Sequence, residues 1–124
     1  MSPDDIRELF RAFGAVDVRR MFSSAGIYAD ETMFAIVHDG MIYLKVDAAS
    51  APAFDREGLP PFTYRRKGKR AALTSYRRMP DRLYDDPEEL ARWARAAVAA
   101  AGRRATGKRR AVTKQRRRPK SGKD

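Results

Sequence analysis

Two apolar runs flank the dipeptide Asp39-Gly40, and this feature constrains the fold more than any other in the chain. An Asp-Gly pair between such runs predicts a β-hairpin, because a two-residue type I′ turn needs positive φ at both central positions. A turn of that length also fixes the register of the two strands, residues 33–38 and 41–46, so that His38 faces Met41. The middle of the chain is therefore predicted to form antiparallel sheet.

This register divides the predicted hairpin into two faces. The first face is wholly apolar and is expected to pack on helices. Its pairs are Val37 with Ile42, Ala35 with Leu44, and Met33 with Val46. The second face pairs Ile36 with Tyr43 and Phe34 with Lys45, which is too apolar to be simply solvated. We expect it to meet another element of the chain or another subunit, so Phe34, Ile36 and Tyr43 are predicted interface residues.

Helices are predicted at both ends of the first hundred residues. Ser2 followed by Pro3 is typical of a helix start, and Gly14 suits the end of that helix. Between them, apolar residues recur with helical spacing at Ile6, Leu9, Phe10 and Phe13. The last helix is predicted to begin after Asp86, with Glu89 completing a capping box, and to end at Gly102. Its apolar stripe consists of Leu90, Trp93, Ala94, Ala97, Val98 and Ala101.

Shorter elements fill the chain between these helices. Residues 26–28 predict a third strand ahead of the hairpin, and residues 19–22 are predicted as extended chain or a short edge strand. A short helix carrying Phe54 follows, and then a second hairpin around Gly68. The order helix, three strands, helix, two strands, helix predicts the α+β class, as a two-layer α/β sandwich with an antiparallel sheet.

Charge is distributed very unevenly along the chain. The formal net charge is +11, yet residues 102–124 alone contain eleven Lys and Arg residues and one acid. This segment has no aromatic residue and few aliphatic ones, so it cannot bury enough apolar surface to offset its ordering entropy. We therefore predict a folded domain over residues 1–101 and a disordered basic tail over residues 102–124.

The two clusters of positive charge are the candidate nucleic-acid contacts. In the tail they are Arg103, Arg104, Lys108, Arg109, Arg110, Lys114, Arg116, Arg117, Arg118 and Lys120. At the tip of the second hairpin they are Arg65, Arg66, Lys67, Lys69 and Arg70. Such side chains neutralise phosphates without reading bases, so binding would be nonspecific and would weaken as salt rises. For the tail we favour nucleic-acid contact over simple solvation, and for the hairpin tip we favour a solvated loop over such contact. Charge alone gives little reason to expect membrane binding.

Residue types that carry chemistry are scarce in this sequence. The absence of cysteine excludes disulfides and thiolate sites, and His38 is the single histidine, expected to end a strand. A Ser-His-Asp site would need Ser23 or Ser24, which nothing in the sequence links to His38. The acids Asp85, Asp86, Glu88 and Glu89 are explained by helix capping. We predict no catalytic, metal or cofactor site, and a cytoplasmic location, since no apolar run suits a membrane helix or signal peptide.

Several short pieces, spread over about residues 10–101, resemble the N-terminal domain of the bacterial TfoX/Sxy family. They are Arg20-Met21-Phe22, Gly26-Ile27-Tyr28, Met33-Phe34-Ala35, Tyr43-Leu44-Lys45-Val46-Asp47, Gly58 and Pro61-Phe62-Thr63-Tyr64. The resemblance implies a two-layer domain similar to type III secretion chaperones, a tendency to form homodimers, and transcriptional coactivation beside a DNA-bound regulator, as in natural competence. Two features depart from the family: Ser23-Ser24 stands where members usually have glycines, and a basic tail replaces the second domain of the competence regulators.

Two functions therefore stay open at the level of sequence. The first is a non-enzymatic regulatory protein of the TfoX type, with a partner in the transcription machinery and a tail that contacts nucleic acid. The second is a small accessory protein that binds DNA or RNA nonspecifically, mainly through the tail. A pocket for a small ligand around Phe34, Ile36 and Tyr43 is a further alternative.

Overall fold

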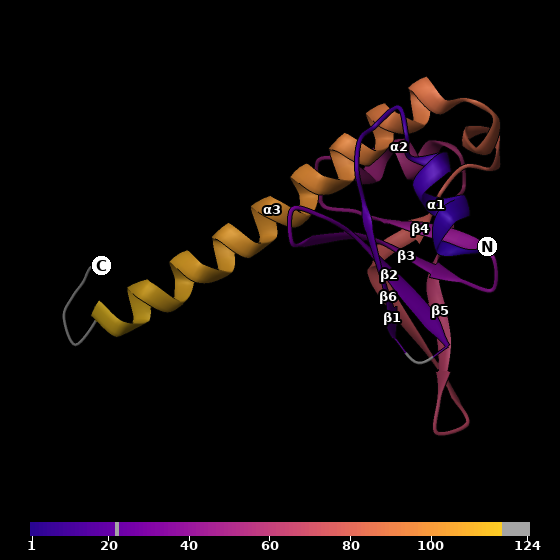
Figure 1. The fold of residues 1–124 in the computed structure, drawn as a ribbon. Helices are drawn as coiled ribbons and strands as arrows, with labels where there is room; N and C mark the ends of the chain where they lie inside the picture. Colours follow the sequence, from indigo (N-terminus) through magenta and orange to yellow (C-terminus); the bar gives the residue numbers. More distant parts are fainter. Residues whose placement is uncertain (22, 118–124) are drawn as a thin grey trace.

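The fold is a single antiparallel sheet with helices on one side and a long final helix (Figure 1). The structure is a computed structural model that describes the backbone of residues 1–21 and 23–117, and the side chains of these residues up to 102 except residue 66. The elements are α1 (Pro3–Leu9), β1 (Asp17–Met21), β2 (Ser24–Ala29), β3 (Thr32–His38), β4 (Met41–Lys45), α2 (Ala51–Arg56), β5 (Pro61–Arg66), β6 (Lys69–Arg78), the 3₁₀ helix η1 (Asp81–Asp85) and α3 (Pro87–Arg117). The strand order is β1-β2-β3-β4-β6-β5. The predicted α+β class is confirmed, with β1 as a full strand at the edge of the sheet.

The central hairpin has the predicted register. His38 pairs with Met41, and the pairing continues to Ala35 with Leu44. Asp39 and Gly40 have φ values of 51° and 73°, as a type I′ turn requires. Two-residue turns with positive φ also join β2 to β3 and β5 to β6, so three hairpins of one kind build most of the sheet.

A β-bulge at Phe34 corrects the predicted faces of β3. Ile27 pairs with Ala35, but its neighbour Tyr28 pairs with Met33, so Phe34 is the extra residue in the ladder. A bulge inverts the alternation of side chains beyond it. The prediction that Met33 lies on the helix side and Phe34 on the opposite face is therefore wrong. Phe34 is fully buried on the helix side, and Met33 packs on the other face.

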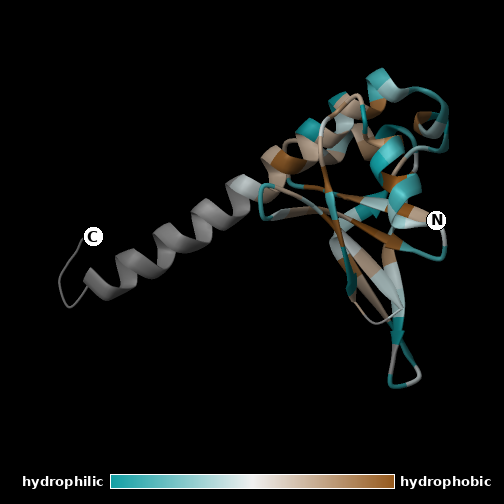
Figure 2. Cartoon of the chain, in the orientation of Figure 1, coloured by the Kyte–Doolittle hydropathy of each residue, from teal (hydrophilic) through white to brown (hydrophobic). Residues whose placement is uncertain are grey.

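The main core lies between the sheet and its helices. Brown hydrophobic positions in Figure 2 concentrate along the strands and on the helical turns next to them. Phe10 and Phe13 of the N-terminal segment pack on Phe34, with ring centroids 5.6 and 5.4 Å away. From α3, the predicted stripe supplies Leu90, Ala94, Ala97 and Ala101 as buried residues, with Trp93 and Val98 partly buried.

A second, smaller core covers the opposite face of the sheet. Ile36 is 2% exposed there and packs with Phe62 and Tyr76, while Tyr43 contacts the Phe62 ring at 4.9 Å. The apolar second face of the central hairpin is thus met by another element of the same chain, the β5–β6 hairpin. Because Phe34 and Ile36 are buried within the chain, only the partly buried Tyr43 offers surface to a partner among the three predicted interface residues.

The helices begin as the sequence predicts, with one difference in capping. At α1, Ser2 accepts a hydrogen bond from the Asp5 amide and Asp5 accepts one from the Ser2 amide, which is a complete capping box. At α3, Asp86 accepts from the Glu89 amide at 3.2 Å. The Glu89 carboxylate does not close that box; it accepts instead from Arg82 and from the Trp93 indole. These two donors lower the pKa of Glu89.

The final helix is longer than the sequence analysis predicts. The expected end at Gly102 is wrong, because α3 continues through Gly102 to Arg117. Arg, Lys, Gln and Ala dominate this stretch and are strong helix formers, and no proline occurs between Gly102 and Pro119. Part of the segment predicted as a disordered tail is thus helical in backbone, and residues 118–124 lie outside the described residues. The proposed domain limit at residue 101 stays a prediction.

Replacing Gly102 with alanine tests this correction. If α3 runs through Gly102, Gly102→Ala stabilises the helix by about 0.8–1 kcal/mol, because alanine has the higher helix propensity. The structure leaves room for the new methyl group, since nothing lies within 4 Å of an added Cβ. We expect a more negative circular dichroism signal at 222 nm and slower amide exchange around residue 102. A helix that ends at Gly102 in a left-handed conformation predicts the opposite, namely a loss of stability.

Candidate functional site

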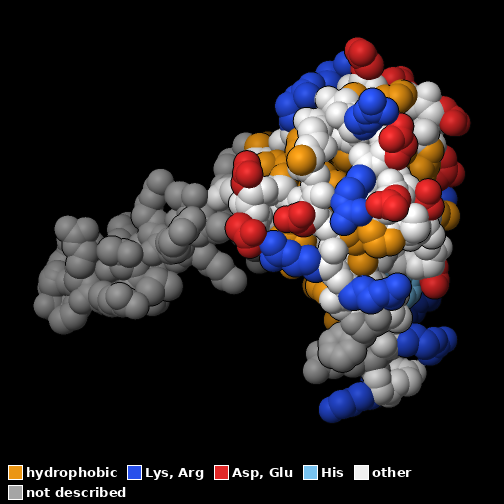
Figure 3. Space-filling view, in the orientation of Figure 1, with side chains coloured by type: hydrophobic (Ala, Val, Ile, Leu, Met, Phe, Trp, Pro, Cys, Tyr) orange, Lys and Arg blue, Asp and Glu red, His pale blue; other side chains and the backbone are white. Residues whose placement is uncertain are grey.

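The tip of the β5–β6 hairpin is the most distinctive charged surface in the described part of the chain. Figure 1 shows the hairpin extending beyond the body of the protein, and Figure 3 shows Lys and Arg side chains at that end. Arg65, Lys67, Lys69 and Arg70 are all exposed. The turn Lys67-Gly68 has φ values of 52° and 77°, which brings the two charged strand ends together.

Strand pairing places like charges directly across from one another at this tip. Arg65 pairs with Arg70, and Arg66 pairs with Lys69. Like charges on opposite strand positions are destabilising. Among the described residues, no carboxylate forms a salt bridge with Arg65, Lys67, Lys69 or Arg70, and the one hydrogen bond found here runs from Arg65 to the Gly68 carbonyl oxygen at 3.3 Å.

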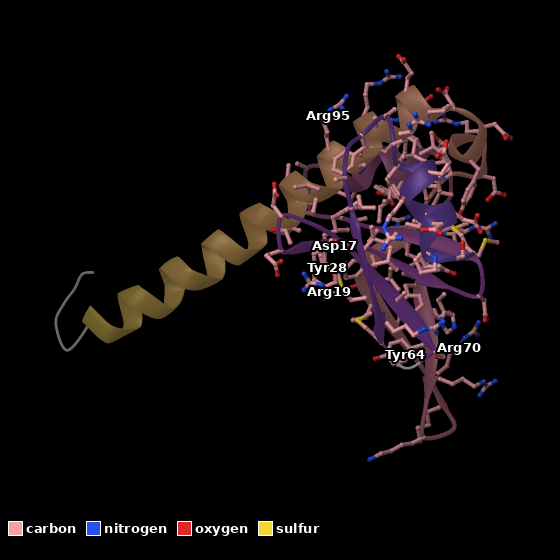
Figure 4. All side chains as sticks on the ribbon, in the orientation of Figure 1. Asp17, Arg19, Tyr28, Tyr64, Arg70 and Arg95 are labelled. Carbon is pink, nitrogen blue, oxygen red and sulfur yellow. The ribbon has the colours of Figure 1, made fainter. Side chains whose placement is uncertain are left out.

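Cations elsewhere on the body are mostly paired. Salt bridges of 2.5–3.3 Å join Arg7 to Asp4, Arg11 to Glu8, Arg19 to Glu31, Arg77 to Asp55, Arg78 to Asp81, and Arg82 to both Glu57 and Glu89. In Figure 4, Arg19 lies beside Tyr28 on the edge of the sheet, and its guanidinium sits 4.1 Å from the ring centre. Glu31 raises the pKa of Arg19 by accepting its hydrogen bonds. The hairpin tip therefore differs from most of the described surface because it gathers several exposed cations that form no salt bridge.

The structure does not bring the hairpin tip and the predicted tail contacts together. Eight of the ten tail residues named from the sequence lie on the C-terminal part of α3, which leaves the body in a different direction from the hairpin (Figure 1). The remaining two, Arg118 and Lys120, lie outside the described residues, as does the side chain of Arg66. The two clusters are thus separate surfaces, and their contacts with nucleic acid stay predictions.

One constellation that the sequence could not assemble is Ser24, His38 and Asp39. The Ser24 hydroxyl lies 2.8 Å from His38 Nδ1, and Asp39 lies 3.6 Å from His38 Nε2. The bulge at Phe34 creates this contact, because an unbroken register would place Ser24 opposite Val37. The distance to Asp39 is too long for the hydrogen bond that orients the imidazole in a hydrolase triad, and the Asp39 side chain is 89% exposed. The arrangement instead closes the end of β3, where His38 also packs against Phe62.

The described residues form two surface hollows and no cluster suited to a metal ion. Within the described residues, no group of three or more His, Asp or Glu side chains is placed to hold a metal ion. A hollow of about 370 Å³ lies between the loops around Leu59 and Pro80, and another of the same size lies between α2 and α3. Neither is lined by Phe34, Ile36 or Tyr43, so the predicted ligand pocket around these residues is not among them. No helix in the described part of the chain combines the length and apolar character needed to cross a lipid bilayer.

Together, the sheet order and the helix-side core define a small α+β domain, from which a cationic hairpin extends. The sequence model of the TfoX N-terminal domain family matches residues 8–101 of this chain. The chain therefore belongs to this family. The family prediction made from the sequence is therefore confirmed. The chain is also 28% identical over 95 residues to Protein Sxy of Escherichia coli (strain K12), which covers 77% of this chain and 45% of that protein. The chain thus spans less than half the length of this relative.

Proposed function

We propose that this protein is a non-enzymatic regulator of the TfoX type, acting in the cytoplasm, that contacts nucleic acid through its cationic surfaces while its folded body engages a protein of the transcription machinery. The family match supports a role in regulation of the competence kind. The observation that carries the contact with nucleic acid is the hairpin tip, where Arg65, Lys67, Lys69 and Arg70 are exposed without carboxylate partners. Homodimerisation through the surface around Tyr43 is part of the same proposal.

Phosphate groups relieve the repulsion that this hairpin carries in the free protein. Each phosphate that a cation neutralises releases a counterion, and the slope of log affinity against log salt becomes steeper by about 0.9 on duplex DNA. Four such contacts give a slope of about 3.6 without any reading of base sequence. Binding of this kind positions a regulator on DNA, and specificity then comes from its protein partner.

Neutralising the hairpin tests the proposal. The variant Arg65→Gln, Lys67→Gln, Lys69→Gln, Arg70→Gln is compared with the wild-type chain by fluorescence anisotropy on a labelled duplex between 50 and 200 mM salt (roughly the range where such contacts are lost). We expect the salt slope to fall by about 3.6, because four phosphate contacts are lost. A control variant with Arg7, Arg11, Arg20 and Arg95 changed to Gln removes the same formal charge from other surfaces. Equal slopes for the hairpin variant and the wild type would contradict the proposal.

The alternative function is a small accessory protein that binds DNA or RNA through the C-terminal segment alone. The concentration of charge over residues 102–124 favours it. It predicts that the hairpin variant binds as the wild type does, whereas removal of residues 102–124 abolishes binding.

A further inference from the structure

A groove of about 370 Å³ runs between α2 and α3, on the helix-bearing side of the sheet. Its apolar lining is formed mainly by Phe54 and Trp93, whose rings meet edge to face at 5.0 Å, and by Ala96 and Ala97. Phe54 is 3% exposed and Trp93 is partly buried, so the groove is a continuation of the main core that the helices leave open to solvent.

All of the charged residues that line the groove are positive. They are Arg56 on α2, Arg92 on α3 and Lys45 at the end of β4. Arg56 and Arg92 are exposed and form no salt bridge with any described residue, unlike Arg77 and Arg82. Lys45 is already engaged, by the Ser75 hydroxyl and the Tyr76 ring. Two guanidinium groups that form no salt bridge with a described residue therefore flank an apolar floor.

We infer that this groove binds an acidic peptide segment of a partner protein, with one apolar side chain against Phe54 and Trp93 and carboxylates paired with Arg56 and Arg92. An apolar groove with charged rims is typical of sites that bind a short amphipathic segment. A small ligand needs several convergent polar groups to orient it. Here the single hydroxyl, that of Ser50, is already bonded to Asp47. The cationic C-terminal segment of this chain has the wrong charge to fill the groove.

The inference deepens the proposed engagement of a protein partner, and it does not depend on nucleic-acid binding. The groove and the hairpin tip share no residue. Loss of one activity without the other therefore shows which of the two proposals fails.

Selection from a random twelve-residue peptide library displayed on phage, with the full chain as bait, tests the inference. We expect enriched peptides to combine two or more acidic residues with an aromatic or large aliphatic residue. Trp93 is the single tryptophan, so the enriched peptides should also change the intrinsic fluorescence in a saturable way. The variant Arg56→Gln, Arg92→Gln should bind them at least about tenfold more weakly, which corresponds to about 1.4 kcal/mol, because both charge-assisted hydrogen bonds to the peptide carboxylates are lost.

A matched control is the variant Arg11→Gln, Arg95→Gln, which removes two exposed arginines outside the groove and should bind as the wild type does. The inference is overturned if no peptide is enriched, if the enriched peptides lack acidic residues, or if both variants bind equally. Saturable quenching of Trp93 by 4-phenylbutyrate without peptide binding would replace the peptide with a small carboxylate. Self-association lost in the Arg56→Gln, Arg92→Gln variant alone, with no peptide enriched, would assign the groove to a second copy of this chain.

Discussion

Replacing Phe34 with alanine is expected to lower the free energy of unfolding by about 3–5 kcal/mol. Phe34 is 0% exposed and makes ring contacts with Phe10 and Phe13, so truncation removes a full aromatic side chain and leaves a cavity between the sheet and α1. The total free energy of unfolding of a native protein is only about 5–15 kcal/mol. A loss of this size is readily measured by urea denaturation followed by circular dichroism.

The neighbouring residue provides the control that makes this result informative. Met33 lies on the opposite face and is partly buried in the smaller core, so Met33→Ala should cost clearly less than Phe34→Ala. If side chains alternated strictly along β3 without a bulge, Met33 would lie on the helix side, and Met33→Ala would cost more stability than Phe34→Ala. If Phe34→Ala does not fold, Phe34→Leu retains most of the side-chain volume and gives a smaller, measurable loss of stability. A loss of stability for the Met33 variant equal to or larger than that for the Phe34 variant would show that the bulge is absent.

Local chemistry made much of the sheet predictable from the sequence. Asp39-Gly40 determines both a turn and a register, because few residue pairs accept positive φ twice. The bulge at Phe34 was not predictable in the same way. Nothing in the residues around Phe34 marks an inserted position, and the bulge is favoured by the tertiary contacts of its ring with Phe10 and Phe13. The end of α3 was missed for a related reason: Gly102 is a common stop signal, but it is tolerated in a helix at a cost of about 1 kcal/mol.

The candidate surfaces also differ in how far the sequence predicts them. The hairpin tip was found from sequence because its cations are neighbours in the chain around Gly68. The groove between α2 and α3 was not found, because Arg56 and Arg92 come together only when both helices pack on the sheet. Ser24 and His38 were likewise linked only by the shifted register of β2 and β3. Surfaces built from one segment are predictable from sequence, and surfaces built from several segments require the fold.

Removing residues 102–124 should cause the largest change in nucleic-acid binding of any variant considered. The segment contains eleven Lys and Arg residues and one acid, against about four unpaired cations at the hairpin tip. With about ten phosphate contacts, the full chain should lose roughly 10⁵-fold in affinity for duplex DNA between 50 and 200 mM salt. The truncated chain, with about four contacts, should lose only about a hundredfold over the same range and should bind far more weakly at the lowest salt.

The truncated chain is expected to keep its fold, so its DNA binding can be compared with that of the full chain. Every α3 residue that is buried among the described side chains lies at or before Ala101, so residues 1–101 retain the helix-side core that these side chains form. Thermal unfolding of the truncated chain should therefore match that of the full chain. Combining the truncation with the four hairpin substitutions should remove most of the remaining salt dependence, because the two densest clusters of positive charge are then gone. If the truncated chain instead binds duplex DNA with unchanged affinity and slope, the C-terminal segment makes no phosphate contacts, and the tail-only alternative is excluded with it.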